Sequence, residues 1–288
     1  MYQLFLGLLS AIPILRRDRP DIILAMGSYS SFAPVAGAIV LRIPYILHEA
    51  NVIPGRLVSM MTAKANAIAI SFESSRYYIK HPMVVDTGMP LRIDLQRKIT
   101  TPKEVENNKF CILITGGSRG AKKLNEVIPL ALKKLNIQHK FKVIHLIGLN
   151  QIEPVKKIYE ESKIEAEVLS YVHNIEKYYD ECDLVISRSG ASTCAELCAF
   201  GKPSLLIPYP YAVHDHQMLN ARALEKAGAA DVIAQKDLTV DWLTSYLSQV
   251  IRDPERRRKQ IFSATQLAKI NAADSVSILL EQVCNERG

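Results

Sequence analysis

LVISRSGASTCAELCAFGKPSLLIPYP, residues 184–210, contains two apolar runs separated by a helical pattern. The first run ends in the small and polar residues SRSGAST, and the second follows a glycine and reads PSLLIPY. Strands this apolar, when they alternate with helices, are buried on both faces of a parallel sheet. The stretch therefore predicts a β-α-β unit and indicates an α/β protein.

The same alternation of strand, turn and helix runs through both halves of the chain. The apolar runs DIILAM, PYILH and NAIAIS precede a polar stretch at residues 97–108, and FCILIT, FKVIHLI and AEVLSY follow it. The polar stretch is typical of a linker. The pattern predicts two Rossmann-like domains with a cleft between them, the first at residues 1–100 and the second at residues 109–268.

The composition is that of an ordinary globular protein. The chain has 288 residues, of which 48% are hydrophobic, and a net charge of +7. This charge favours anionic partners such as nucleotides, phosphates or an acidic membrane surface, but it is too small to indicate nucleic acid. The five cysteines form no CxxC pair. We therefore expect neither disulfides nor a zinc site, and a reducing cytosol.

The opening stretch, MYQLFLGLLSAIPILRRDRP, contains an apolar run followed by basic residues. The run is too short to span a membrane, and the order of charges is unlike that of a signal peptide. We expect a helix that packs on a sheet. A helix that lies on a membrane surface is the alternative.

The segment TGGSRGA at residues 115–121 follows a predicted strand and opens a predicted helix. Backbone amides and the helix dipole at such a turn can receive a phosphate, which makes Gly116, Gly117 and Gly120 candidate phosphate-loop residues. Their spacing differs from both the dinucleotide fingerprint and the P-loop. A glycine-rich turn without a ligand is the alternative.

Glu196 stands in the helix after the SRSGAST turn, at the carboxyl edge of the sheet, where α/β proteins bind ligands. Two interpretations stay open. The spacing from Thr193 to Glu196 fits a capping box, in which the glutamate bonds back to the start of the helix. Alternatively, its carboxylate accepts hydrogen bonds from both hydroxyls of the ribose of a nucleotide.

Two further turns are rich in polar residues. Residues 48–51 read HEAN, which fits either a solvated turn or a cleft edge, and residues 214–217 read HDHQ. For the second turn a sugar-contacting loop is favoured over a metal site, because adjacent positions lack a ligand spacing. No DxD pair occurs in the sequence, so a diphosphate would be held by amides and arginines, and we expect no metal.

Taken together, the motifs resemble those of the MurG family, the UDP-N-acetylglucosamine transferases that form lipid II from lipid I in peptidoglycan synthesis. The similar motifs include MGSYSS, PYILHEAN, TGMPLR, ITGGSRGAKKLN, SRSGASTCAEL, GKPSLLIPYP and DHQMLNARALEKAGAA. The resemblance implies the GT-B glycosyltransferase fold and an inverting transfer of GlcNAc from UDP-GlcNAc to the muramyl 4-hydroxyl of lipid I. It implies no cofactor and no nucleic acid. It also implies a peripheral protein on the anionic cytoplasmic face of the bacterial inner membrane.

The resemblance also implies which residues bind the donor. These residues are Asn51, Arg92, Ser118, Val172, Ala191, Ser192, Thr193, Glu196 and Gln217. In this set Glu196 would hold the ribose, the Val172 backbone the uracil, and Ser118 the diphosphate with Arg92 beside it. Gln217 and Asn51 would hold the sugar.

Compared with the family pattern, the chain begins after the first strand and its GGTGGH loop. The resemblance therefore predicts an incomplete first domain, on which residues 269–288 pack. The histidine often proposed to deprotonate the acceptor lies on that loop, and the alternative gives this role to His48 or Glu49. Two other functions stay open, a non-catalytic UDP-sugar-binding fragment and an enzyme similar to UDP-GlcNAc 2-epimerase.

Overall fold

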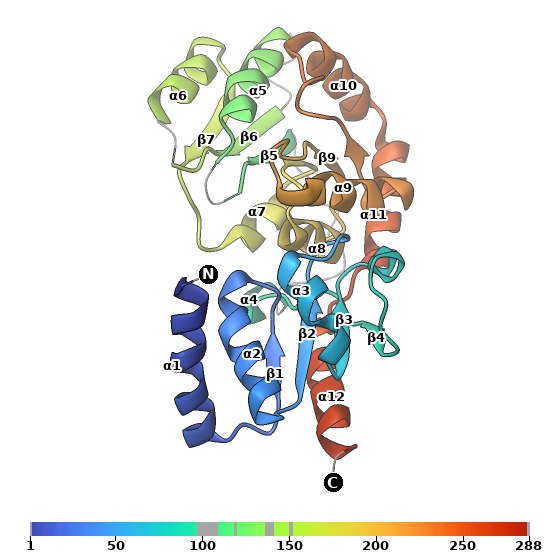
Figure 1. The fold of residues 1–288 in the computed structure, drawn as a ribbon. Helices are drawn as coiled ribbons and strands as arrows, with labels where there is room; N and C mark the ends of the chain where they lie inside the picture. The colour runs from blue at the N-terminus through green and yellow to red at the C-terminus, as the bar shows by residue number, and fades with distance from the viewer. Residues whose placement is uncertain (1, 97–108, 118–119, 136–140, 150–151, 287–288) are drawn as a thin grey trace. The chain divides into compact units, whose positions relative to one another are not determined.

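The protein forms two compact α/β units, each built on its own parallel sheet (Figure 1). The computed structural model describes residues 2–96, 109–117, 120–135, 141–149 and 152–286, with side chains from residue 7 onward. The first unit joins Met1–Leu91 to Lys269–Gly288, and the second unit is Arg92–Ala268. The chain therefore crosses between the units twice. The predicted α/β class is confirmed.

The first unit contains a four-stranded sheet in which every pairing is parallel. Its strands follow the chain order and are β1 (Ile23–Ala25), β2 (Tyr45–Glu49), β3 (Ala67–Ile70) and β4 (Val84–Asp86). Its helices are α1 (Tyr2–Asp18), η1 (Tyr29–Ser31), α2 (Phe32–Leu41), α3 (Arg56–Met61), η2 (Thr62–Lys64), η3 (Glu73–Tyr77) and α12 (Ala272–Asn285).

Both faces of this sheet are covered, which explains why most residues of its strands are apolar. Leu47 and Ile68 pack with residues of α2 and α3 on one face, while Ile46 and Ala69 pack with Val276 and other residues of α12 on the opposite face. Successive side chains of a strand point to opposite faces, so both sets of side chains meet apolar neighbours, and the polar exceptions stand at the ends of β2 and β4. The C-terminal helix thus completes the core of the first unit.

Helix α1 lies along α2, on the side of α2 away from the strands (Figure 1). Gly37 of α2 permits this approach, because a Cβ at this position would lie only 2.8 Å from the side chain of Leu15. The expectation of a helix packed directly on the sheet is corrected, since α2 supplies the packing surface. Among the described residues, no helix combines the length and the apolar character needed to cross a membrane.

The second unit contains a six-stranded parallel sheet in the order β10-β9-β8-β5-β6-β7. Its strands are β5 (Phe110–Thr115), β6 (Phe141–Leu146), β7 (Glu165–Leu169), β8 (Leu184–Ser187), β9 (Ser204–Leu206) and β10 (Asp231–Val232). Its helices are α4 (Ile93–Gln96), α5 (Lys122–Lys134), α6 (Ile152–Glu161), α7 (Ile175–Glu181), α8 (Ala191–Ala199), η5 (Val213–Asp215), α9 (His216–Lys226), α10 (Val240–Arg252) and α11 (Pro254–Leu267).

The central strand β8 brings three chain segments to one edge of this sheet. Ser187, its last residue, pairs with Thr115 of β5 on one side and with Leu206 of β9 on the other. Because all three strands are parallel, the loops that follow them leave the sheet at the same carboxyl edge. The glycines that follow β5, Gly116 and Gly117, therefore lie at the same edge as the SRSGAST and YPYAVHD stretches.

Candidate functional site

A pocket of about 190 Å³ lies at the carboxyl edge of the second sheet. It is formed by the ends of β5, β6 and β7 together with α7 and α8. The residues that line it are Arg92, Thr115, Gly117, Leu146, Ser170, Tyr171, Val172, Ile175, Tyr179, Thr193 and Glu196. The combination of apolar side chains with one arginine and one carboxylate fits a ligand that has both a ring and polar groups.

The glycine loop after β5 folds into a tight turn that only small residues permit. A Cβ on Gly116 would lie 2.4 Å from the backbone nitrogen of Ala121, so the returning chain occupies the space of a side chain. Gly117 has a φ of +77°, which few other residues adopt. Its amide lies 3.3 Å from Thr115 Oγ1 and borders the pocket. Ser118 lies outside the described residues.

Helix α8 begins at Ala191, and Gly190 is its N-cap residue, with an extended conformation and no side-chain capping bond. Thr193 is therefore already inside the first turn and cannot be the N-cap that a capping box requires. The first intrahelical bond runs from the Cys194 amide to the Gly190 carbonyl at 2.9 Å. The amides of Ala191 and Ser192 precede this bond, so they are available to a ligand.

The Glu196 side chain bonds to a neighbouring helix instead of to the start of its own. Its Oε2 accepts a hydrogen bond of 2.9 Å from the Tyr179 hydroxyl of α7, which corrects the capping-box interpretation. Burial raises the pKa of the Glu196 carboxyl above its ordinary value, while the bond from Tyr179 and the charge of Arg92 oppose the rise. The structure thus places a partly buried carboxylate at the wall of the pocket.

Arg92, the first residue of the second unit, lines the same pocket. Its Nη2 donates to the carbonyl oxygen of His173 at 3.4 Å, next to Val172. The guanidinium is therefore held beside the β7–α7 loop and contributes positive charge opposite Glu196. The Arg92 guanidinium can therefore donate hydrogen bonds to an anionic group that enters the pocket.

Arg188, by contrast, is a structural arginine. It is 8% exposed, and its Nη1 donates to the carbonyl oxygens of Ile207 and Pro208 at 2.9 and 3.1 Å. Burial lowers the pKa of its guanidinium to about 10. The side chain joins the end of β8 to the end of β9. It therefore fixes the loop that leads into α9.

Gln217 lies in the first turn of α9, and its amide oxygen accepts a hydrogen bond of 2.9 Å from the Tyr209 amide. Its own carbonyl accepts a bond of 2.8 Å from the Ser189 hydroxyl. Gln217 is thus tied to the loop before α8, but it does not line the pocket.

Within the described residues, no group of three His, Cys, Asp or Glu side chains could hold a metal ion.

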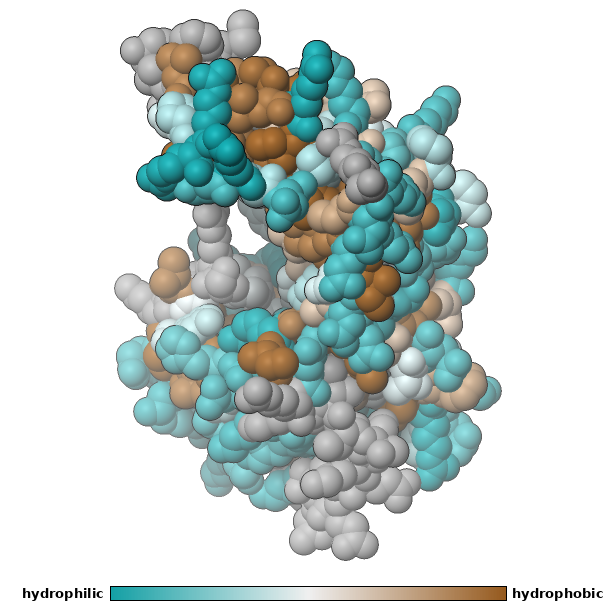
Figure 2. Space-filling model, turned by 90° about the horizontal axis from the view of Figure 1, so that it is seen from below, coloured by the Kyte–Doolittle hydropathy of each residue, from teal (hydrophilic) through white to brown (hydrophobic). Residues whose placement is uncertain are grey.

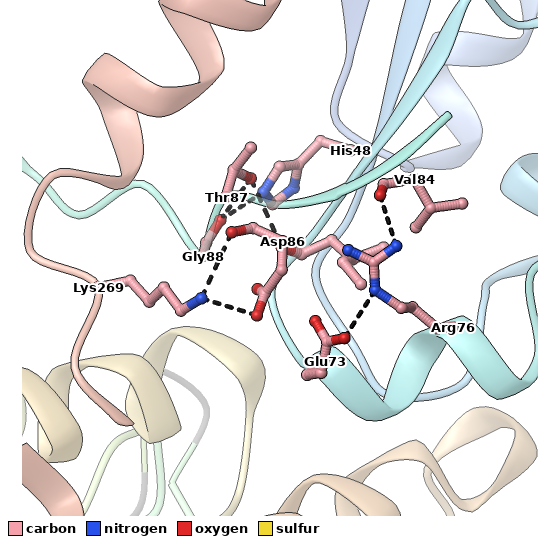
Figure 3. Close-up of polar contacts among 9 residues, drawn as sticks. His48, Glu73, Arg76, Val84, Asp86, Thr87, Gly88 and Lys269 are labelled. Carbon is pink, nitrogen blue, oxygen red and sulfur yellow. Dashed lines mark hydrogen bonds and ion pairs between the residues drawn. The ribbon is translucent and has the colours of Figure 1, made fainter. Parts of the chain in front are cut away.

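The carboxyl edge of the first sheet is organised differently. Glu49 is 3% exposed, and its Oε1 and Oε2 accept hydrogen bonds from the amides of Asn51 and Gly55 at 2.9 and 2.8 Å. His48 is fully buried, with its Nε2 2.9 Å from the carbonyl oxygen of Gly88 (Figure 3). Neither side chain is exposed for taking a proton from an acceptor. The alternative that gives them the role of base loses its support.

The structure brings together part of the predicted set. The predicted residues that line the pocket are Arg92, Gly117, Val172, Thr193 and Glu196. Ala191, Ser192, Gly116 and Gly120 lie in the adjoining turns, and Asn51 belongs to the first unit. Tyr179, the partner of Glu196, was not predicted from the sequence, because the pattern IEKYYDE does not indicate which of its two tyrosines turns toward α8.

Comparisons with known proteins agree with this arrangement. Residues 1–70 match the family model of the glycosyltransferase family 28 N-terminal domain, and residues 111–276 match that of the C-terminal domain. A Geobacter metallireducens protein is 35% identical over 91% of this chain and 73% of its own length. Its name is UDP-N-acetylglucosamine--N-acetylmuramyl-(pentapeptide) pyrophosphoryl-undecaprenol N-acetylglucosamine transferase.

Solved structures are similar over nearly the whole chain. The crystal structure of Acinetobacter baumannii MurG is 28% identical with a TM-score of 0.83, over 98% of this chain and 80% of that one. A UDP-GlcNAc 2-epimerase from Neisseria meningitidis bound to UDP-GlcNAc has a TM-score of 0.69 over 96% of this chain and 80% of its own. At 17% identity, the likeness to the epimerase concerns the fold alone.

Two parallel-sheet α/β domains that match both family 28 models define a GT-B glycosyltransferase. The 35% identity to the Geobacter metallireducens transferase, over 91% of this chain, identifies the family within this class. The chain belongs to the MurG family, as its motifs predicted.

Proposed function

We propose that this chain transfers N-acetylglucosamine from UDP-N-acetylglucosamine to N-acetylmuramyl-(pentapeptide) pyrophosphoryl-undecaprenol, the reaction named in its relatives. The observation that carries the proposal is the pocket in the second unit, where Glu196 and Arg92 border a glycine loop and the start of α8. A nucleoside diphosphate can be bound by a carboxylate that accepts from its ribose hydroxyls and by groups that donate to its phosphates, and this edge provides both.

The donor is expected to lie across the carboxyl edge of the second sheet. The pocket, at about 190 Å³, is smaller than the roughly 300–1,000 Å³ typical of whole-ligand sites, so it takes the uridine portion. The uracil meets the Val172 backbone, and the ribose hydroxyls donate to Glu196. The diphosphate then lies at the first turn of α8 beside Arg92, and the sugar extends toward Gln217.

The reaction is a single displacement with inversion at the sugar. The muramyl 4-hydroxyl of the acceptor attacks the anomeric carbon, a base removes the hydroxyl proton, and the bond to UDP breaks with its electron pair on the phosphate oxygen. The amides at the start of α8 and the charge of Arg92 stabilise the negative charge that develops on UDP. These donors act most strongly on the leaving group.

We also propose peripheral attachment to the anionic cytoplasmic face of the inner membrane through the first unit, since the acceptor named above carries an undecaprenyl chain. Leu9 and Ile14 of α1 are 52% and 50% exposed, and Arg16 and Arg17 lie in its last turn. Figure 2 shows apolar patches among hydrophilic side chains on one face of the molecule. Exposed apolar side chains followed by basic ones on one helix favour binding at headgroup level. Flotation with anionic and neutral vesicles tests this, and equal binding to both would contradict it.

A turnover assay separates the proposed function from its alternatives. The chain is incubated with labelled UDP-GlcNAc and the lipid-linked acceptor, and we expect labelled disaccharide lipid and free UDP. Labelled N-acetylmannosamine without acceptor would favour an epimerase. Donor binding without turnover would favour a UDP-sugar-binding protein, and either result would overturn the proposed transfer.

A further inference from the structure

Both crossings of the chain between the units are held at one place in the first unit. The first crossing leaves β4 through Asp86 and Gly88 and enters the second unit at Arg92, and the second crossing returns at Lys269. Lys269 Nζ lies 2.7 Å from Asp86 Oδ2, as Figure 3 shows. The two crossings are thus joined to each other by an ion pair.

Gly88 permits the close approach of the two crossings because it has no side chain. Its φ is +82°, and a Cβ at this position would lie 2.4 Å from the Cβ of Lys269 and 3.3 Å from that of Ala272. Another residue would strain the backbone and displace the stem of Lys269. A side chain at position 88 would therefore also disturb the ion pair of Lys269 with Asp86.

His48 fixes the same point to the sheet. Because a carbonyl oxygen only accepts, His48 Nε2–H donates the 2.9 Å bond to Gly88, and Thr87 Oγ1 donates to the same oxygen at 3.2 Å. The next residue, Glu49, anchors the following loop through Gly55. The end of β2 thus positions both the crossing and the HEAN turn.

The ion pair adds little to the stability of the first unit, whose core already includes the packing of α12 on the sheet. The Lys269 side chain is 42% exposed and that of Asp86 16%, and an ion pair with one partner this exposed contributes on the order of 1 kcal/mol. Asp86 Oδ1 is buried and has no hydrogen-bond partner among the described residues, which is unfavourable. Because the Asp86–Lys269 ion pair adds so little stability, we look for its role in positioning the chain segments that it joins.

We infer that Asp86, Gly88, Lys269 and His48 form a crossing clamp that positions Arg92 at the donor pocket. Only three residues separate Gly88 from Arg92, so the Cα atom of Arg92 lies at most about 14 Å from that of Gly88. Arg92 then borders the pocket and bonds to the loop after β7. A loosened clamp lets this short segment shift, and Arg92 loses its alignment. The inference rests on the proposed function in one respect, that Arg92 contacts the bound nucleotide.

A double-mutant cycle with UDP as the probe tests the inference. Lys269→Met keeps an unbranched stem over Gly88 but removes the ion pair. By calorimetry on the full chain, it should weaken UDP binding roughly 3- to 10-fold, and it should have little further effect in an Arg92→Ala background. Asp86→Asn should reproduce the loss. The control is Lys109→Met, which removes a lysine of similar exposure to Lys269, 45% against 42%, from a 2.6 Å pair with Glu165 and should leave UDP affinity unchanged.

The outcomes separate a positioning role from a merely structural one. Equal losses from Lys269→Met in both backgrounds would overturn the inference, as would a lower unfolding temperature with unchanged UDP affinity. If Arg92→Ala alone has no effect on UDP affinity, the clamp has no target and the inference also fails. Absence of UDP binding by the unaltered chain would instead overturn the proposed function.

Discussion

Glu49 is a buried acid and Glu196 a partly buried one, each near the carboxyl edge of a parallel sheet, and burial raises the pKa of both. They differ in the donors that their oxygens meet. Both oxygens of Glu49 accept hydrogen bonds from backbone amides of the following loop. Glu196 accepts one bond, from the Tyr179 hydroxyl, and borders a pocket. The first carboxylate organises its own chain, whereas the second is placed to receive a ligand.

Residue type and position at the edge of a sheet therefore do not by themselves identify a carboxylate that binds a ligand. A buried carboxylate is stabilised by the donors around it, and where the loop already provides them a ligand can add little. The HEAN turn and the SRSGAST turn look equally polar in the sequence. The hydrogen bonds that the chain itself supplies separate their roles.

Glu49→Ala should give the largest effect on stability. The amides of Asn51 and Gly55 lose their acceptor, so the free energy of unfolding of the first unit should fall by about 2–4 kcal/mol. Chemical denaturation measures this loss. Glu49→Gln retains one acceptor oxygen and should lose less. A loss below about 0.5 kcal/mol for Glu49→Ala would mean that the carboxylate does not organise the loop.

Gly116→Ala should distort the glycine loop, because its Cβ would meet the Ala121 backbone at 2.4 Å. We expect the second unit to lose about 1–3 kcal/mol of unfolding free energy, with weaker UDP binding. Gly117→Asn is the matched control, since a Cβ there meets nothing within 4 Å and asparagine tolerates a positive φ. Equal losses of stability in the two variants would show that the close backbone contact is not the constraint.

Acidification should weaken UDP binding through Glu196. The ionised carboxylate accepts bonds from the ribose, and because burial raises its pKa, protonation begins above the ordinary value of 4.5. The pH dependence of stability without ligand has the opposite sign to that of binding. The folded chain holds the Glu196 proton more tightly than the unfolded chain, so the free energy of unfolding falls as pH rises from 4.5 through the raised pKa. Titrations with UDP-GlcNAc, whose diphosphate has no group that takes up a proton in this range, at neutral and mildly acidic pH check the binding slope, which should be smaller in Glu196→Gln.

Thr193→Ala should have the smallest effect on stability. Gly190 is the N-cap of α8, and Thr193 makes no capping bond. The free energy of unfolding should therefore change by no more than about 0.5 kcal/mol in chemical denaturation. A capping box would instead predict a loss of about 0.5–2 kcal/mol, and a loss at the upper end would restore that interpretation.

The sequence predicted the α/β class well because strands buried on both faces leave uninterrupted apolar runs such as FCILIT and DLVIS. It also indicated the glycine loop, since close backbone approach at Gly116 excludes other residues. These features depend on local pattern. Their signal therefore lies within a few residues of chain.

Features that depend on tertiary contacts were not predictable from local pattern. The start of α8 was ambiguous because SRSGAST contains several residues that can cap a helix, and only the backbone identifies Gly190. The bond from Tyr179 to Glu196 joins two helices separated by β8. The packing of α1 on α2 depends on Gly37, which has no special signal in an apolar helix.

The assignment of the nucleotide site to the second unit is tested by calorimetric titration of UDP into the unaltered chain and into the Glu196→Ala and Glu49→Ala variants. We expect the unaltered chain to bind UDP and Glu196→Ala to weaken binding by about 1–3 kcal/mol, with a smaller loss for Glu196→Gln. Glu49→Ala, measured where the second unit is folded, should bind with nearly unchanged affinity. Unchanged affinity in Glu196→Ala together with lost affinity in Glu49→Ala would contradict the account and move the nucleotide site to the first unit.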